Sequence, residues 1–473
     1  FLAQRGVATV LCEKGHIAGE QSSRNWGWCR KMARDPREIP LIIESLRLWE
    51  RMNGTVEAET GFRTCGIMYL GDSPEALGNM EAWLEHAREY QLDTRLIDGG
   101  EVSQLLPGSA KRWAGALYTP SDGKAEPQMA APAIAEGARR RGATILTGCA
   151  VRGIETAAGR VAGVVTEKGR IACQSIVLAG GAWSRLFCGN LGIDLPQLKV
   201  LGSVMRTEPF EGGPEISATG GLFGYRKRMD GGYTVATLGV RTIDLVPDSF
   251  RLLPEYLPTV RMHWNKLRFR VGRRFIEEWQ TPRRWELDAA SPFEKVRVLD
   301  PEADPLVLER ARASIGESFP AFKNVAVAET WGGMIDVMPD AIPVISAVDT
   351  LPGFFIATGF SGHGFGIGHR RLEPAPAPLG ELGQDRRRTT PARRRSRERW
   401  RRWPSPAFRE PQRPGRAAMP AIPCRRTGAC SLPPPHAAGR RTKIRRRGDP
   451  CRCSAAIRRS CRDSPSACRR SGC

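Results

Sequence analysis

Apolar positions near the start of the chain change from the spacing of a strand to the spacing of a helix. Residues 7–12 form a short apolar run, which predicts a buried strand. After Asp35 and Pro36, apolar residues recur every three or four positions, and Glu38 stands where a capping box with Asp35 would need it. The apolar face of this helix is formed by Ile39, Ile42, Ile43, Leu46 and Trp49. We expect the helix to be structural.

The remaining pattern divides residues 1–368 into two interleaved parts. A helix over 126–141 and strands at 144–146, 149–155, 161–166 and 175–179 follow the order of a Rossmann-like α/β unit. Residues 56–124 and 196–322 instead combine short strands, charged turns and a helix over 73–90, which predicts a mixed sheet. The expected fold class is α/β with mixed α+β character. A Rossmann-like domain of residues 1–55, 125–195 and 323–368 is interleaved with a second domain of residues 56–124 and 196–322.

Charge is distributed unevenly along the chain. The 473 residues include 72 Lys and Arg against 50 Asp and Glu, a net charge of +22. Residues 369–473 hold 29 of the basic and 7 of the acidic residues, so the preceding residues hold 43 of each and are neutral overall. A neutral body excludes a dedicated nucleic-acid-binding domain there, because such domains carry a basic surface.

The basic segment 369–473 has a biased composition. It consists mainly of Arg, Pro, Ala, Ser, Gly and Cys without a sustained apolar period, so we expect it to be disordered. Its single lysine, Lys443, stands against 28 arginines, which favours a GC-rich gene read out of frame. The alternative is an arginine-rich tail that binds nucleic acid or other anionic surfaces through charge alone. No specific nucleic-acid partner is expected.

Cysteine usage and hydropathy indicate the cellular compartment of the protein. The body cysteines lack paired spacing, which fits a reduced, cytoplasmic protein; they are Cys12, Cys29, Cys65, Cys149, Cys173 and Cys188. The seven tail cysteines form no C-x-x-C pair, so we expect no zinc or other metal site. No apolar run reaches the ~18 residues of a transmembrane helix. We expect a cytoplasmic protein, with peripheral contact at the inner face of the membrane as the alternative.

An acid ends the first predicted strand, because Glu13 directly follows residues 7–12. In dinucleotide-binding βαβ units, the acid at the end of the second strand accepts hydrogen bonds from the ribose hydroxyls. The alternative is a surface glutamate after a buried strand. Residue 1 already lies in the preceding helix, and no G-x-G-x-x-G occurs in the chain. We therefore expect a first strand and its Gly-rich turn to precede residue 1.

Four further stretches indicate close approach of the backbone to a ligand. Residues 22–28 (SSRNWGW) offer hydroxyls, amides and two flat aromatic walls, although a turn with core aromatics would look the same. Residues 176–184 (IVLAGGAWS) run from an apolar strand into a glycine pair. Residues 331–345 (WGGMIDVMPDAIPVI) precede residues 357–368 (ATGFSGHGFGIG), where five glycines in ten residues follow a strand.

Together with Glu13, these motifs in this order resemble the FAD-dependent amine and D-amino-acid oxidoreductases, a group that contains D-amino-acid dehydrogenase, glycine oxidase and sarcosine oxidase. The resemblance covers residues 1–368 and implies a Rossmann-like FAD-binding domain beside a substrate domain with a large mixed sheet. It implies that Glu13 binds the adenosine ribose and that the backbone of Val151 brackets the adenine. The other implied FAD contacts are Ser22, Ser23 and Asn25 along the pyrophosphate and flavin, Gly181 and Trp183 near the adenosine diphosphate, and Gly362, Gly364, Phe365, Gly366 and Ile367 at the flavin pyrimidine ring. Residues 22–28 contain no histidine, where some relatives attach FAD covalently, so we expect non-covalent FAD.

The resemblance also implies the chemistry. In this family a neutral amine gives a hydride to the flavin and the imine then hydrolyses, so the protein positions groups and sets electrostatics. Arg226 and Arg241 are candidates to bind a substrate carboxylate, with Tyr225 as a hydroxyl donor. The alternative for each arginine is a surface position on a strand. His363 could stabilise negative charge on the reduced flavin, or be a solvated turn histidine.

The expected function is FAD-dependent oxidation of a small amine or amino acid, most like D-amino-acid dehydrogenase, with oxygen or a quinone as electron acceptor. The alternative is an inactive, truncated and frameshifted product whose basic tail binds nucleic acid or anionic surfaces non-specifically.

Overall fold

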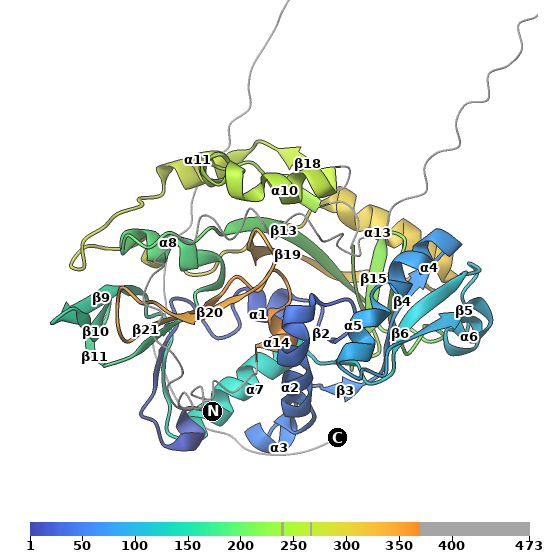
Figure 1. Cartoon of the computed structure of the whole chain (residues 1–473), viewed down its shortest axis with the longest axis horizontal. Coiled ribbons are helices and arrows are strands. Elements are labelled where there is room, and N and C mark those ends of the chain that lie inside the picture. Colours follow the sequence, from blue (N-terminus) through green and yellow to red (C-terminus); the bar gives the residue numbers. More distant parts are fainter. Residues whose placement is uncertain (238–240, 265–266, 369–473) are drawn as a thin grey trace, which may run out of the picture. The chain divides into compact units, whose positions relative to one another are not determined.

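The computed structural model describes residues 1–237, 241–264 and 267–368 (Figure 1). Its largest sheet has eight strands in the order β19-β13-β16-β15-β14-β4-β6-β5. Neighbouring strands are antiparallel except β14 and β4, which are parallel. The strands are β4 (Ile67–Gly71), β5 (Arg95–Asp98), β6 (Gly115–Thr119), β13 (Leu198–Thr207), β14 (Ser217–Gly220), β15 (Phe223–Lys227), β16 (Tyr233–Ala236) and β19 (Val327–Val337).

One face of this sheet is covered by helix α13 (Pro305–Ser318), whose Asp304 N-cap accepts hydrogen bonds from two backbone amides of the first turn. The apolar side chains between helix and sheet form one core cluster with many aromatic rings. Its aromatic members include Phe223, Tyr225, Tyr233, Phe319 and Phe322. Burial of these large rings is the main contribution that fixes α13 on the sheet.

Three three-stranded sheets and one two-stranded sheet accompany the large sheet in the part of the chain that carries the predicted ligand motifs. They are β1 (Val10–Cys12) with β8 (Thr144–Leu146), β9 (Val151–Ala157) with β10 (Arg160–Thr166) and β11 (Gly169–Ala172), β12 (Ile176–Leu178) with β21 (Phe354–Thr358) and β20 (Val344–Ala347), and β2 (Trp28–Cys29) with β7 (Gly123–Lys124) and β3 (Arg63–Thr64). The β1–β8 and β12–β21 pairs are parallel, as Rossmann-like units require.

Helices α2 (Ile39–Glu50), α3 (Met52–Val56) and α7 (Pro127–Arg140) pack together with the short helix α14 (Gly364–Ile367). Their core contains Ile42, Leu46 and Trp49, so the predicted apolar face of 39–49 is the face that packs. The remaining helices are α1 (Gln21–Arg24), α4 (Pro74–Glu81), α5 (Leu84–Glu89), α6 (Gly99–Leu105), α8 (Ser184–Asn190), α9 (Pro247–Arg251), α10 (Leu253–His263), α11 (Arg273–Gln280) and α12 (Pro292–Lys295). Strands β17 (Arg241–Asp244) and β18 (Leu267–Arg270) form a separate parallel pair.

The predicted α/β fold with mixed α+β character is confirmed. The helix expected over 73–90 is instead two helices, α4 and α5, separated at Trp83. The Trp83 ring is buried and its indole N–H donates to the Arg34 carbonyl at 2.9 Å, which holds the chain in a bend there. The domain boundaries stay a prediction. Strand β19 belongs to the segment 323–368, which the sequence analysis assigned to the Rossmann-like domain, but it pairs within the large sheet.

Two further expectations meet the structure at specific points. Asp35 accepts from the Arg37 amide at 2.9 Å, but the expected capping box is absent because the Glu38 carboxylate pairs with His363 instead. No helix within the described ranges is both long and apolar enough to cross a membrane. The expectations for the basic tail concern residues 369–473, which lie outside the described residues.

Candidate functional site

The predicted ligand motifs meet around one buried carboxylate, Asp336, which lies near the end of β19 and is 2% exposed. It accepts from the Gly359 amide at 2.7 Å and from the Thr358 hydroxyl at 3.3 Å. The Gln21 side-chain amide donates to its other oxygen at 2.9 Å and accepts from the Ala182 amide at 3.1 Å. Burial raises the pKa of Asp336. Segments around 21, 182, 336 and 359 are thereby tied together, although they are far apart in the sequence.

Glu13 lies at the carboxyl end of β1, where the sequence placed it. Its carboxylate accepts one hydrogen bond from the described residues, from the Gly15 amide at 2.8 Å. Its backbone carbonyl accepts from the Cys149 amide at 2.8 Å, which brings the start of β9 at Val151 close to it. Burial raises the pKa of Glu13, with the Gly15 amide acting against it. The unused acceptor positions of the carboxylate suit the paired hydroxyls of a ribose.

Trp183 follows Gly181 in a short 3₁₀ turn and lies beside the loop that continues from Glu13. Its indole N–H lies 3.0 Å from both oxygens of Glu20, and the Lys14 ammonium lies 4.6 Å from the ring centroid. Lys14 also pairs with Glu20 at 2.6 Å. The sequence motifs did not single out Lys14 or Glu20, since a Lys-x₅-Glu spacing in a loop has no recognisable signature.

Gly181 is required by its surroundings. Its φ is +50°, and a Cβ there would lie 2.6 Å from the end of the Gln21 side-chain amide, on the side that accepts from the Ala182 amide. Any larger residue would displace Gln21 from the Asp336 carboxylate that it contacts. The glycine pair of 180–181 therefore acts on the site through α1.

The side chains of residues 22–25 are mostly engaged in their own turn. Ser23 donates to the Ala18 carbonyl, and Asn25 donates to the Ser22 carbonyl at 3.0 Å and accepts from the Gly27 amide at 2.8 Å. The exposed Ser22 hydroxyl makes no hydrogen bond to the described residues. Of the three predicted contacts, Ser22 thus offers a side chain available to a phosphate, while Ser23 and Asn25 shape the loop.

The glycine-rich loop after β21 turns sharply into α14. Gly362 has φ +85° and is exposed, whereas Gly366 and Ile367 are buried. Gly366 lies against the Cys29 backbone, and the Ile367 carbonyl accepts from Ser45 at 2.9 Å. The first amides of α14, including those of Gly364 and Phe365, have no acceptor within the helix. These donors suit the carbonyl oxygens of a flavin pyrimidine ring.

In this loop the His363 side chain faces Glu38, a residue that the sequence analysis placed in a helix capping box. His363 Nδ1 lies 3.1 and 3.0 Å from the two Glu38 oxygens. Burial lowers the pKa of His363 to about 4, with the charge of Arg34 acting in the same direction and Glu38 against it. The imidazole is therefore uncharged at neutral pH. Stabilising negative charge on a reduced flavin would require a different protonation state.

The structure separates the remaining catalytic candidates. Arg226 is 1% exposed and forms a bidentate pair with Glu126 at 2.6 and 2.9 Å, while its Nε donates to the Trp26 carbonyl at 2.6 Å. Tyr225 points into the α13 core, where its buried hydroxyl has no partner among the described residues. Arg241 begins β17, and its side chain lies outside the described atoms. Neither Arg226 nor Tyr225 presents a free polar group to a substrate.

The donor and acceptor set fits FAD at both ends of the cofactor. Glu13 supplies free acceptors for a ribose, and the amides that open α14 supply donors for flavin carbonyls. The Asp336 contacts connect the loop before α14 with α1, the helix that follows Glu13 in the chain. Flavin, when bound, supplies the two-electron chemistry of an oxidoreductase.

Comparison with known proteins agrees with this arrangement. The family model described as "FAD dependent oxidoreductase" matches residues 1–369. The beta subunit of sarcosine oxidase from an Arthrobacter species is 24% identical over 77% of this chain and 79% of its own. The structure of L-amino acid deaminase from Proteus myxofaciens, in complex with anthranilate, is 35% identical, covers 78% of this chain and 83% of that one, and has a TM-score of 0.74. The corresponding enzyme from Proteus vulgaris is 32% identical, covers 77% and 86%, and has a TM-score of 0.73.

The predicted cofactor and the resemblance inferred from the motifs are both confirmed by these matches. The family model spans the whole described part of the chain, and two solved relatives exceed 30% identity over most of it. The chain therefore belongs to the FAD-dependent oxidoreductase family.

Proposed function

We propose that this chain oxidises a small amine or amino acid, with FAD as the group that accepts the hydride. The observation that carries the proposal is the network around Asp336, which ties α1 and the glycine pair to the loop after β21. The matched relatives, named for sarcosine and for L-amino acids, support a substrate with an amine beside a carboxylate. The electron acceptor is oxygen or a quinone.

The carboxylate of such a substrate would pair with Arg30. This arginine lies close enough to His363 and Glu38 to influence the pKa of each. Its guanidinium carbon lies 5.4 Å from the Tyr69 ring centroid, and it is half-buried. Within the described part of the chain, Arg30 has no ion pair with a carboxylate, in contrast to the closed pair of Arg226. One Arg30 Nη donates to the Met32 carbonyl, and the remaining N–H groups can donate to a substrate carboxylate.

The proposal also concerns whether the substrate is an L- or a D-amino acid. The motifs resemble D-amino-acid dehydrogenase, whereas the two relatives above 30% identity are named for L-amino acids. We expect the L series to be the better substrates. The alternative of an inactive product with a basic tail predicts no reaction with either series.

The test is anaerobic reduction of the FAD-loaded protein by L- and D-amino acids, sarcosine and simple amines without a carboxylate. Bleaching of the flavin spectrum by members of one class identifies the substrate. Arg30→Met should raise KM for carboxylate-bearing substrates about ten- to a hundredfold, as loss of a charge-assisted hydrogen bond implies, and leave KM for simple amines unchanged. No bleaching by any amine, or an equal effect on both classes, would contradict the proposal.

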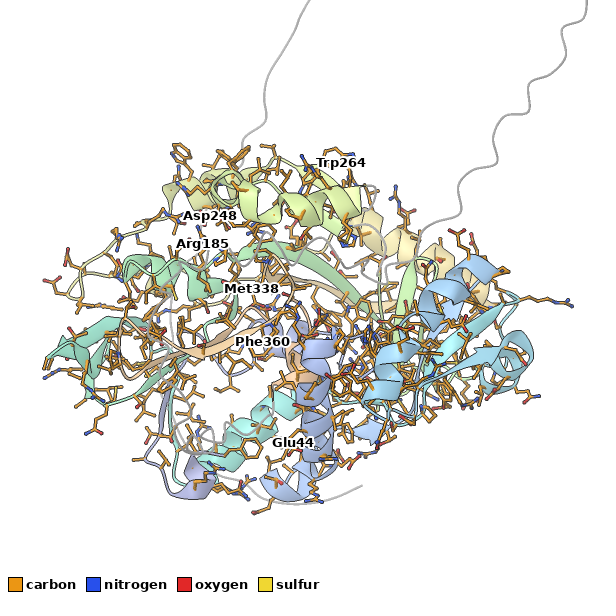
Figure 2. All side chains as sticks on the ribbon, in the orientation of Figure 1. Glu44, Arg185, Asp248, Trp264, Met338 and Phe360 are labelled. Carbon is orange, nitrogen blue, oxygen red and sulfur yellow. The ribbon has the colours of Figure 1, made fainter. Side chains whose placement is uncertain are left out.

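The expected peripheral contact with a membrane would use one surface of the body. Large apolar side chains are exposed throughout residues 247–284. They are Phe250, Leu253, Met262, Trp264, Phe269, Val271, Ile276 and Trp279, of which Trp264 and Trp279 are 65% and 69% exposed. We call this set the apolar patch. Helix α10, strand β18 and helix α11, which carry most of the patch, lie in one layer (Figure 1), and Trp264 projects from its outer side (Figure 2).

The charge of residues 247–284 indicates which kind of surface the apolar patch would bind. Residues 247–284 contain nine Lys and Arg against four Asp and Glu, within a body that is neutral overall. A second copy of the same basic surface would repel it across a two-fold axis. An anionic bilayer instead attracts the arginines and accepts tryptophans at its interface. We therefore propose an anionic membrane surface as the partner of the apolar patch.

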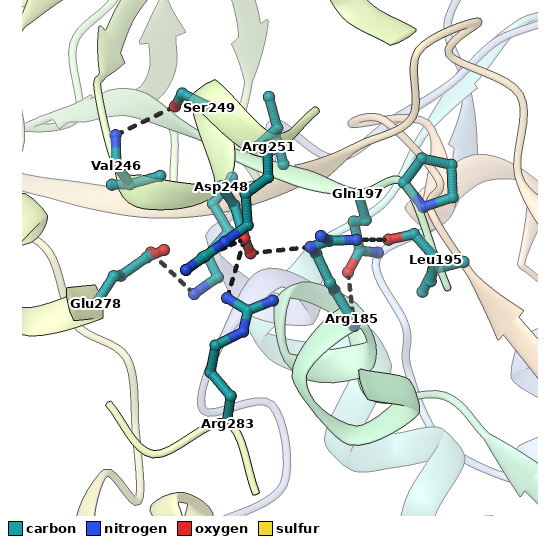
Figure 3. A network of polar contacts seen from close by, with 12 residues as sticks. Arg185, Leu195, Gln197, Val246, Asp248, Ser249, Arg251, Glu278 and Arg283 are labelled. Carbon is teal, nitrogen blue, oxygen red and sulfur yellow. Dashed lines mark hydrogen bonds and ion pairs between the residues drawn. The ribbon is translucent and has the colours of Figure 1, made fainter. Parts of the chain in front are cut away.

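The patch is held firmly to the rest of the body. Asp248, in α9, accepts from Arg185 of α8 at 2.8 Å, from Arg283 at 2.9 Å and from Arg251 at 3.0 Å (Figure 3). Although burial acts against it, these partners lower the pKa of Asp248 to about 2, so the carboxylate is ionised throughout the physiological range. Lys199 of β13 pairs with Glu278 of α11 at 3.0 Å. The patch is thus fixed on the body, so binding of the patch to a membrane would hold the body there as well.

A further inference from the structure

The contact between His363 and Glu38 joins two distant segments that the sequence analysis did not connect. Glu38 ends the short turn before α2, and His363 stands immediately before α14 in the flavin loop. The Glu38 side chain is 1% exposed, and that of His363 is 25% exposed. One edge of the imidazole therefore faces a buried carboxylate, and the ring is reachable from outside the protein.

Several charged groups surround this pair. Arg34 Nη1 lies 4.0 Å from a Glu38 oxygen and has no hydrogen-bond partner among the described residues. Arg30 acts on both members of the pair, and Arg37 lies near the carboxylate from the same turn. Two arginines, Arg30 and Arg34, thus act on both the glutamate and the histidine, while the Arg37 guanidinium is paired with Asp35. Their positive potential favours the ionised carboxylate and opposes a positive imidazole.

The hydrogen-bond chemistry then leaves one arrangement. An ionised carboxylate only accepts hydrogen bonds, so the proton between Glu38 and His363 must be on Nδ1. A neutral imidazole carries a single ring proton, and Nε2 is left with a lone pair. The pKa directions agree: that of Glu38 lies below its ordinary value despite its burial, and that of His363 is lowered to about 4.

We propose that Glu38 is a positioning residue that keeps the single proton of a neutral His363 imidazole on Nδ1, so that Nε2 offers a lone pair at the flavin loop. The lone pair can accept a hydrogen bond from an N–H donor and can supply no proton in exchange. Its use by an amine substrate rests on the proposed function, whereas the protonation state does not. His363 thereby acts as an acceptor that fixes the orientation of a donor, and it adds no positive charge.

The test is side-chain ¹⁵N NMR of the full chain labelled at histidine, recorded from pH 8 to pH 4.5 with and without FAD. The chain contains six histidines, and loss of one signal in His363→Gln assigns His363. We expect Nδ1 to carry the proton and Nε2 to remain essentially unprotonated down to about pH 5, with protonation of Nε2 beginning only below that pH. A His363 signal that titrates near pH 6.5, the ordinary pKa of histidine, would overturn the proposal. So would a proton on Nε2 of His363 at neutral pH. Because the spectrum needs no turnover, its result is independent of whether any amine is oxidised.

Two variants separate positioning from a structural contact. In Glu38→Gln the amide can donate to Nδ1, so a share of the Nε2–H tautomer should appear. Glu44→Gln, an exposed position on α2, is the matched control and should leave the His363 signals unchanged. In Arg34→Met, loss of one positive neighbour should raise the pKa of His363. Unchanged tautomer and titration in both Glu38→Gln and Arg34→Met would contradict the proposal, and the wild-type spectrum decides it even if a variant fails to fold.

Discussion

At the scale of single residues, the clearest contrast lies between Arg226 and Arg30. Both are arginines of one neutral body, and the sequence analysis named Arg226, together with Arg241, as a candidate to bind a substrate carboxylate but did not name Arg30. In the structure the Arg226 guanidinium binds Glu126 and the Trp26 carbonyl and is almost fully buried. Pairing of this kind depends on a contact across 100 residues, so no local pattern could show it. Arg226 therefore supports the chain that carries the Trp26–Trp28 segment.

Arg226→Met should destabilise the body by about 3–5 kcal/mol, because it leaves the buried Glu126 carboxylate without its partner. Urea unfolding followed by circular dichroism measures this difference. The double variant Arg226→Met/Glu126→Leu should recover part of the loss, since no unpaired charge remains. Arg139→Met, which breaks an exposed pair on α7, is the control and should cost less than about 1 kcal/mol. Equal effects of the buried and the exposed substitutions would show that the Arg226 pair is solvated.

At the scale of elements, the prediction succeeded where a pattern is local. Helices over 39–49 and 126–141 and the strands around 144 and 176 were recognisable because their apolar spacing directly reflects the face they bury. The role of Glu38 was missed, since a carboxylate three residues after an N-cap looks the same whether it caps the helix or meets a histidine 325 residues away. The network around Asp336 was missed for the same reason. Its members come from four segments and share no spacing.

Two parallel strands of the Rossmann-like part have free edges among the described residues. Strand β1 pairs only with β8, and β12 pairs only with β21. Val10 and Leu11 on β1 and Val177 on β12 are exposed, although parallel strands are normally covered on both faces. The apolar surface and unpaired backbone groups of each edge suit pairing with a further parallel strand.

A chain extended at residue 1 by a strand and a Gly-rich turn should therefore bind FAD more tightly than residues 1–473 alone. The strand would pair the free backbone of β1, and the turn would supply amides for the pyrophosphate, each worth roughly 1.5–3 kcal/mol. Flavin absorbance after gel filtration measures binding, and hydrogen exchange at residues 10–12 measures strand pairing. An extension of equal length with a scrambled sequence is the control. Stoichiometric FAD in the unextended chain would show that other segments hold the phosphates.

At the scale of the whole molecule, positive charge occurs in two places with different chemistry. Residues 369–473 carry a net charge of +22 and few large apolar side chains, whereas residues 247–284 combine a small excess of arginine with the apolar patch. Pure charge attraction to an anionic surface is screened as salt rises. Insertion of apolar side chains is not weakened by salt in this way. Salt therefore distinguishes the two contributions in the full chain.

The patch should hold the full chain on anionic vesicles at salt concentrations that release the tail. In about 0.5 M salt the Debye length falls to a few ångströms, so adsorption through charge alone should be lost. Trp264→Ser/Trp279→Ser should then reduce vesicle partitioning about thirtyfold or more, because inserting the two rings contributes at least about 2 kcal/mol. Met129→Ser/Leu306→Ser, which removes exposed apolar side chains outside the patch, is the matched control and should partition like the wild type. Co-sedimentation measures partitioning, and quenching of tryptophan fluorescence by brominated lipid reports insertion. Loss of all binding by the wild-type chain in high salt, or equal binding by both double variants, would assign the membrane contact to the tail and remove the patch from it.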